Sequence, residues 1–149
     1  MIFDIKILGI FLVIYFAMIS SAFWESYSEG RNAWGMGKFG FKTKVFGFEV
    51  SGYHIFLFFI TWPLLLLLPF VIFGWDRYYF GVVMSAFFSG LIVEDIFWYI
   101  VNPQVKFYEF WMDFSNYYPW LKIRSRKIIP VGYLIWLFIA LIFWFFFWA

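Results

Sequence analysis

The sequence predicts an all-α integral membrane protein with four transmembrane helices, a surface β-hairpin and an interfacial amphipathic helix. Only 13% of the residues are charged and 65% are apolar, whereas soluble domains carry about 25% charged residues. Four apolar stretches reach the roughly 17–25 residues that a spanning helix needs. They cover about residues 7–24, 55–75, 78–101 and 128–149. These stretches occupy most of the chain, so we expect one membrane domain over residues 1–149.

The first expected helix, residues 7–24, contains no charged side chain. Ser20 and Ala22 offer small residues of the kind found at signal-peptide cleavage sites. However, Asp4 offsets Lys6 in the preceding segment, which is unlike the positively charged start of a signal peptide. We therefore expect this helix to be retained.

The connection that follows contains a short β-hairpin pattern. Residues 38–50 alternate apolar residues with others, and the alternation changes phase near Val45. Such a pattern predicts two short strands lying at the membrane surface. The alternative is a Phe-rich interfacial loop.

The second and third helices are expected to form an antiparallel pair. Gly74 and Asp76-Arg77 lie between them and predict a tight turn. Pro63 and Pro69 in residues 55–75 leave backbone carbonyls without donors, so we expect this helix to bend.

The third helix, residues 78–101, carries an acidic pair, Glu94-Asp95, in an otherwise uncharged stretch. A carboxylate at membrane depth is costly and usually faces a partner, water or an ion. At 100° per residue the two acids point to different faces. Asp95 flanks a row of small residues centred on Ser85, and Glu94 groups with Trp98 toward another helix, a subunit or a wet groove.

The third connection predicts an interfacial helix over about residues 103–115. Asn102-Pro103 suits the start of a helix. Phe107, Phe110 and Phe114 then fall on one face of an amphipathic helix. A basic cluster follows just before the last apolar stretch, and it either sets the orientation or binds lipid head groups. Its members are Lys122, Arg124, Arg126 and Lys127.

The basic residues also predict the orientation of the chain. The two long connections, residues 25–50 and 102–127, hold nine of the eleven lysines and arginines. Because cytoplasmic loops carry the excess of positive charge, we expect both connections in the cytoplasm and both termini outside the cell membrane.

One histidine and the two acids form a candidate metal site, with His54, Glu94 and Asp95 as ligands. His54 lies 22 residues before the turn at Asp76 and the acids 18 and 19 after it, so their depths differ by about 5 Å. Nitrogen and oxygen donors suit a divalent metal such as Zn, Mn or Fe. Further groups near this site would orient the ligands or cap the helix, namely Tyr53, Trp98, Asn102 and Glu109.

The alternative for these acids is structural pairing with Lys106, Arg124, Arg126 or Lys127. The chain has no cysteine, which excludes thiolate metal sites and Cys nucleophiles, and its single histidine excludes haem held between two histidines of this chain.

Three functions follow from these patterns. The first is a scaffold or accessory subunit of a homo-oligomer or larger membrane complex, with no role in nucleic-acid binding. The second is a metal-dependent membrane enzyme acting on a lipid. The third is an ion or proton pathway that uses Glu94.

Two segments carry a resemblance to known proteins. Residues 45–54 read VFGFEVSGYH before a Leu- and Pro-rich stretch, and residues 94–103 read EDIFWYIVNP. They resemble a group of small prokaryotic four-helix membrane proteins with a Glu-Asp-x2-Trp-x3-Asn-Pro segment, over about residues 45–133. The resemblance implies a membrane scaffold of that type and assigns no catalytic role to any residue.

Overall fold

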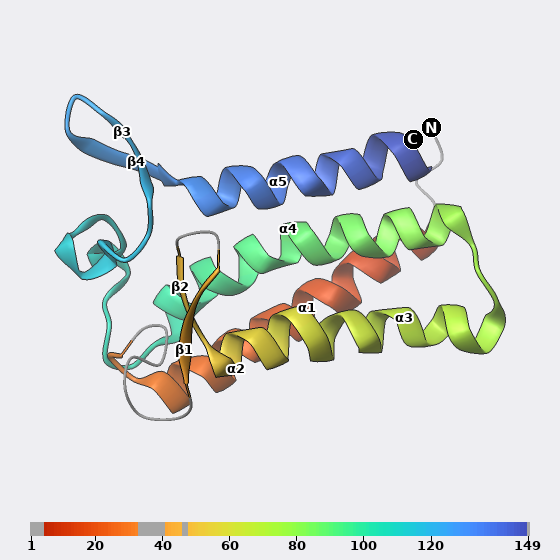
Figure 1. Cartoon of the computed structure of the whole chain (residues 1–149), viewed down its shortest axis with the longest axis horizontal. Helices are drawn as coiled ribbons and strands as arrows, with labels where there is room; N and C mark the ends of the chain where they lie inside the picture. The colour runs from red at the N-terminus through yellow and green to blue at the C-terminus, as the bar shows by residue number, and fades with distance from the viewer. Residues whose placement is uncertain (1–4, 33–40, 46–47, 149) are drawn as a thin grey trace.

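The computed structural model describes residues 5–32, 41–45 and 48–148 and is mostly helical (Figure 1). Its α-helices are α1 (Ile5–Glu29), α2 (Gly52–His54), α3 (Trp62–Phe73), α4 (Arg77–Val101) and α5 (Val131–Phe143). Two antiparallel hairpins pair β1 (Lys42–Val45) with β2 (Phe48–Ser51), and β3 (Trp120–Ile123) with β4 (Arg126–Pro130). Wider π-helical turns are η2 (Ile55–Thr61) and η5 (Trp144–Trp148), and 3₁₀ turns are η3 (Phe107–Trp111) and η4 (Asp113–Ser115).

Three helices are long and apolar enough to cross a membrane, and they are Ile5–Glu29, Gly52–Phe73 and Arg77–Val101. The fourth apolar helix is shorter, Val131–Phe147. It begins later than residue 128 because the preceding residues pair in β4, and Pro130 precedes the first turn of α5. The fourth span therefore stays a prediction.

Helix α1 continues beyond its expected end near residue 24. Its buried residues include Ile14, Met18, Ala22 and Glu29, which follow one another at spacings of four or seven. Such residues lie on one face of a helix. Gly30, at φ +61°, ends the helix, and its N–H donates to Ser26 O at 3.0 Å. The left-handed conformation is one that glycine adopts without a steric penalty.

The second long helix begins directly after the first hairpin. In that hairpin, Lys42 pairs with Ser51 and Thr43 with Val50, which confirms the predicted strands as far as the described residues extend. Residues 38–40 and 46–47 of the predicted hairpin lie outside them. The Ser51 side chain then caps α2 by accepting from His54 N. The widened turns of η2 precede Pro63, whose ring crowds the turn before it.

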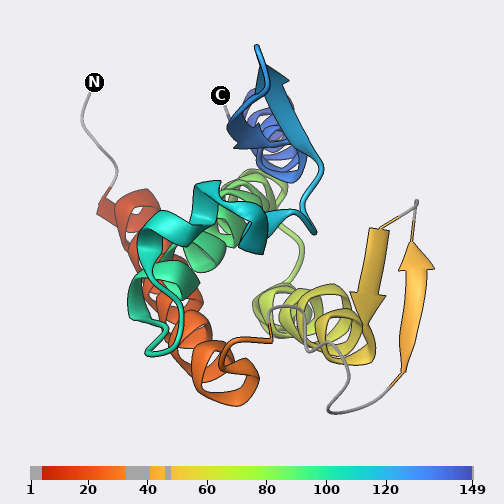
Figure 2. The ribbon, with the colours of Figure 1, turned by 90° about the vertical axis from the view of Figure 1, so that its left-hand side faces the viewer.

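Helix α4 packs against both α1 and α5 (Figures 1 and 2). Small residues allow α1 to approach closely, since a Cβ at Gly90 would lie 3.1 Å from Met18 Cγ. Tyr15 Oη donates to Ser89 Oγ at 2.9 Å across the same interface. Close packing of small residues is a common way to hold helices together in lipid.

The prediction of an interfacial helix over residues 103–115 is wrong, because the structure has two short 3₁₀ turns there. The aromatic residues do not share one face: Phe110 is buried, whereas Phe107 and Trp111 are exposed. Ser115 Oγ donates to Phe110 O at 2.5 Å, which folds the segment back on itself. Asn102 ends α4 and does not start a new helix.

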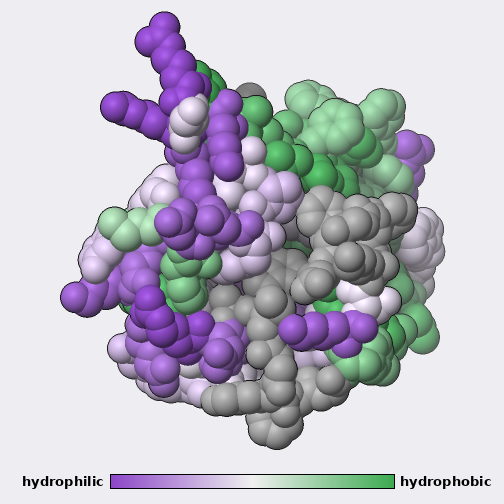
Figure 3. All heavy atoms as spheres, turned by 60° about the vertical axis from the view of Figure 1, so that its left-hand side comes forward, coloured by the Kyte–Doolittle hydropathy of each residue, from purple (hydrophilic) through white to green (hydrophobic). Residues whose placement is uncertain are grey.

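The β3–β4 hairpin was not expected from the sequence. Arg124 and Ser125 form its turn with φ values of 47° and 68°. Two consecutive residues with positive φ are typical of the tight turns that suit the twist of paired strands. Both hairpins and the 3₁₀ turns lie at the same end of the helices (Figure 1). Hydrophilic side chains gather over this end (Figure 3). Its assignment to the cytoplasm stays a prediction.

Candidate functional site

A cluster of two acids and the histidine lies between α1 and α2. Glu25 and Glu29 come from the last turns of α1, one helical turn apart on the same face, and His54 ends α2. One donor atom from each residue lies within 4.8 Å of those of the others. Glu25 is 4% exposed and Glu29 7%, so the cluster is nearly closed to solvent. The N and O donors suit a borderline divalent metal.

The imidazole of His54 is held from both sides. Its Nε2 lies 3.0 Å from Glu25 Oε1, and its Nδ1 lies 2.7 Å from Ser51 Oγ. The rings of Tyr53 and Phe58 pack against it, with centroids 5.1 and 6.0 Å away. A histidine that binds a metal through one nitrogen is usually oriented by a hydrogen bond at the other. Ser51 occupies that position here.

Glu94 of α4 closes the cluster from a third helix. Its carboxyl group approaches that of Glu25, and the residue is 6% exposed. In the part of the chain that the structure describes, Glu94 Oε1, Tyr53 Oη and Trp98 Nε1 are buried with no hydrogen-bond partner. Buried polar atoms without partners are costly. A bound water can satisfy each of them, and a cation can satisfy the carboxylate oxygen of Glu94.

Asp95 faces a different group of residues. Tyr118 Oη donates to both carboxylate oxygens, at 2.6 and 2.8 Å, and Tyr133 Oη donates to Oδ2 at 2.5 Å. Burial and the nearby Asp95 carboxylate raise the pKa of Tyr118 well above its usual value. Tyr118 therefore stays protonated and keeps donating, and Asp95 serves as the acceptor of a buried hydrogen-bond network.

The structure brings the predicted metal ligands together only in part. The sequence pattern grouped His54 with Glu94 and Asp95, but the structure groups it with Glu25 and Glu29, places Glu94 beside Glu25, and assigns Asp95 to tyrosines. Glu25 and Glu29 were missed because the first helix was expected to end near residue 24. The signal that identifies them is the row of buried positions that continues from Met18 through Ala22.

Of the basic residues considered as partners of the acids, Lys106 and Lys127 have other contacts, and Lys106 Nζ lies 5.9 Å from the ring centroid of Tyr108. Lys127 Nζ donates to Met112 O and Ser115 Oγ, and its ammonium lies over the ring of Trp120. Lys122, Arg124 and Arg126 are exposed on the β3–β4 hairpin.

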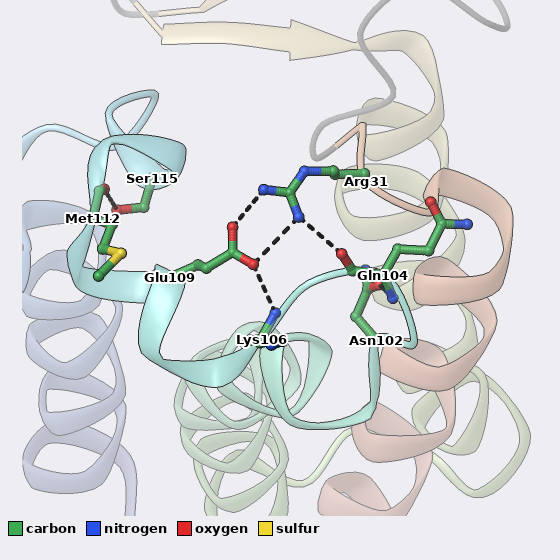
Figure 4. A network of polar contacts seen from close by, with 7 residues as sticks. All are labelled: Arg31, Asn102, Gln104, Lys106, Glu109, Met112 and Ser115. Carbon is green, nitrogen blue, oxygen red and sulfur yellow. Dashed lines mark hydrogen bonds and ion pairs between the residues drawn. The ribbon is translucent and has the colours of Figure 1, made fainter.

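Glu109, expected near the metal site, belongs instead to a network at the surface (Figure 4). Arg31 Nη2 contacts Glu109 Oε2 at 2.5 Å, and Arg31 Nη1 donates to Gln104 O at 2.9 Å. The hydrogen bond from Arg31 lowers the pKa of Glu109. Trp98 is buried and its ring stacks on that of Phe114.

Asn102 links the ends of α1 and α4. Its Nδ2 donates to Gly30 O at 2.7 Å, and its Oδ1 accepts from Gln104 N at 2.8 Å. Gly30 follows Glu29 directly, so this contact holds the end of α1 that carries two of the clustered acids. Asn102 is therefore a positioning residue for the cluster.

Replacing Asn102 with alanine should destabilise the fold by about 1–3 kcal/mol, because it leaves the buried Gly30 carbonyl without its donor. Thermal unfolding in detergent, followed by circular dichroism, measures the change. Asn116→Ala is a suitable control, since Asn116 is exposed and bonds to Asp113. An equal loss in both variants would contradict the positioning role.

Comparisons with protein-family profiles, with curated proteins and with solved structures found no match.

Proposed function

We propose that the protein is an integral membrane protein that holds one divalent metal ion between α1, α2 and α4. Glu25, Glu29 and His54 are the proposed ligands, and Glu94 is the neighbouring carboxyl group. The observation that carries this proposal is that donor atoms of Glu25, Glu29 and the half-buried His54 lie within 4.8 Å of one another.

The surface of the helices supports insertion in a membrane. Helix α3 has no buried residue, and large apolar side chains such as Val71 and Phe73 are 80% and 86% exposed. In water so much exposed apolar surface would be unfavourable. Lipid around α3 removes this cost. Three helices of the described residues are also long and apolar enough to cross a membrane.

One pair of donor atoms already has the separation that a shared ion requires. Two donor atoms that each lie about 2.1 Å from one ion are about 3.0–3.4 Å apart. His54 Nε2 and Glu25 Oε1 are 3.0 Å apart. The Ser51 hydroxyl at Nδ1 leaves Nε2 directed at the cluster.

The charges of the site also favour a cation. Glu25 and Glu29 bring two carboxyl groups to one imidazole, and Glu94 adds a third beside Glu25, in a nearly closed space. Several carboxylates buried together repel one another and lose their hydration. A divalent cation would offset both effects.

The composition of the site determines the chemistry that it supports. Three protein ligands leave a coordination position for water, and a metal makes bound water more acidic. Glu94 lies beside Glu25 as a further carboxyl group of the site. The cluster lies where the ends of α1 and α4 meet the start of α2, at the end of the bundle with the long connections. The substrate that we propose is therefore a lipid, and the bond that water would cleave lies near its head group.

Metal analysis of the purified chain tests the proposal. The protein would be loaded separately with Zn²⁺, Mn²⁺ and Fe²⁺ in detergent, freed of excess metal by gel filtration, and analysed by mass spectrometry of the elements. We expect about one equivalent of at least one of these metals. Retention no higher than that of empty detergent micelles, for all three metals, would reject the proposal.

The scaffold or accessory role in an oligomer or larger complex stays a prediction. It is compatible with the metal proposal, because the exposed face of α3 can contact a second subunit as well as lipid. The mass of the particle in detergent tests it.

A further inference from the structure

The β3–β4 hairpin is a second candidate binding element. We propose that it binds the head groups of anionic membrane lipids through Lys122, Arg124 and Arg126. This inference depends on the proposed membrane insertion and does not depend on the metal ion.

The hairpin concentrates positive charge. Residues 120–130 contain four basic side chains and no acidic one. Three of the four, those of Lys122, Arg124 and Arg126, are exposed, and hydrophilic side chains project where the hairpin lies (Figure 3). Exposed clusters of Lys and Arg beside an apolar helix are attracted to anionic lipids.

Lys127 differs from these three cations. Its ammonium donates to Met112 O and Ser115 Oγ, and it lies 5.2 Å from the ring centroid of Trp120. Burial lowers the pKa of Lys127. This side chain ties the hairpin to the 3₁₀ turns, so we exclude it from the set of residues that bind lipid.

The base of the hairpin is held in place. Trp120 Nε1 donates to Ser115 O, and Val131 N donates to Pro119 O, both at 2.8 Å. The strands pair Ile123 with Arg126, and the register shifts between Leu121 and Lys122. The hairpin that carries the exposed cations is therefore held against the 3₁₀ turns.

Apolar side chains alternate with the cations. Leu121, Ile123 and Ile128 are 46%, 58% and 47% exposed, and Ile123, Arg124, Arg126 and Ile128 line a shallow hollow. Guanidinium groups suit phosphate oxygens, and exposed isoleucines gain from contact with the apolar part of a lipid. The two together match a lipid, which joins a phosphate to long apolar chains.

The position of the hairpin supports the same partner. Strand β4 ends at Pro130 and α5 begins at Val131 with no intervening loop, so the hairpin continues the end of an apolar helix (Figure 1). Where α5 lies in the bilayer, the hairpin lies at the level of the head groups.

Native mass spectrometry of the full-length chain in detergent tests the proposal, with phosphatidylglycerol as the anionic lipid and phosphatidylcholine as the neutral one. Near an anionic surface each cation contributes roughly fivefold in affinity. The variant Arg124→Gln/Arg126→Gln should therefore bind phosphatidylglycerol about 25-fold more weakly than the natural chain, with phosphatidylcholine binding unchanged. Added salt should reduce the preference of the natural chain, because exposed charges are screened.

The matched control is Lys42→Gln/Lys106→Gln, which removes the same charge from other connections at this end. An equal loss in both double variants would reject a specific role of the hairpin. Full competition by soluble glycerol 1-phosphate would also overturn the proposal, since the ligand would then be a free phosphate. Metal retention should be normal in both variants, which separates this test from that of the metal centre.

Discussion

Replacing His54 with alanine is expected to abolish stoichiometric metal binding by the purified chain. The change removes the nitrogen donor and its contact with Glu25. Loss of an outer partner alone typically lowers metal affinity 10–100-fold, so the loss of a direct ligand should exceed about 100-fold. Elemental analysis after gel filtration measures the metal content.

Thermal unfolding provides a second measurement of the same prediction. A metal present at 100 times its dissociation constant stabilises the folded state by about 2.7 kcal/mol. The natural chain should show this gain, and His54→Ala should show none. Glu25→Gln, which keeps the size of the side chain, should behave like His54→Ala. A full equivalent of metal on His54→Ala would contradict the proposed centre.

Two further variants show whether the loss of metal binding is specific to the proposed ligands. One replaces a residue that only positions a ligand, and the other replaces an acid of the surface network. Ser51→Ala should weaken metal binding about 10–100-fold without abolishing it, because the hydroxyl only orients the ring. Glu109→Gln is the control, since Glu109 pairs with Arg31 in the surface network. Its metal content should equal that of the natural chain.

Replacing Asp95 with alanine is expected to destabilise the fold strongly and to leave metal binding intact. The buried hydroxyls of Tyr118 and Tyr133 would lose their acceptor. Each unsatisfied buried group costs about 1–3 kcal/mol, so the total should be about 2–6 kcal/mol. Unfolding in detergent by heat or by SDS, followed by circular dichroism, measures the change.

A mutant cycle tests whether the two tyrosines are the cause. In the background Tyr118→Phe/Tyr133→Phe, the Asp95 carboxylate itself would be buried without donors. The further change Asp95→Ala should then raise stability rather than lower it, because an orphaned buried charge is removed. Additive losses across the cycle would show that the network does not stabilise the fold.

The helices could be predicted with fair accuracy because their signal is local. Length and apolarity place α1, α3 and α4 near their observed positions, and the alternation before Val50 predicts the first hairpin. The prediction of an interfacial helix over residues 103–115 was wrong, because contacts with distant segments override the helical spacing of its aromatic residues. Phe110 packs against Tyr99 and Tyr133, which come from two other helices. The second hairpin was not predicted, because the basic residues of its strands were interpreted only as setting the orientation of the chain or binding lipid head groups.

The site could be predicted only in part. Burial of an acid in an apolar stretch is costly, so the sequence alone indicates Glu94 as a candidate site residue. His54 is a candidate because it is the single histidine of the chain. The sequence does not indicate Glu25 and Glu29, because a helix end near an expected membrane surface is an ordinary place for an acid. Their role depends on where α1 ends, and Gly30 and Asn102 determine that end.

The sequence by itself determined the apolar character and the approximate length of the long helices, because apolarity and helical rise are properties of each segment taken alone. The tertiary structure decided which acids meet the histidine. Glu25 and Asp95 differ in partner because α1 brings one carboxyl group to His54, while Tyr118 and Tyr133 fold over the other. Such choices depend on how separate segments pack, and no local pattern records them.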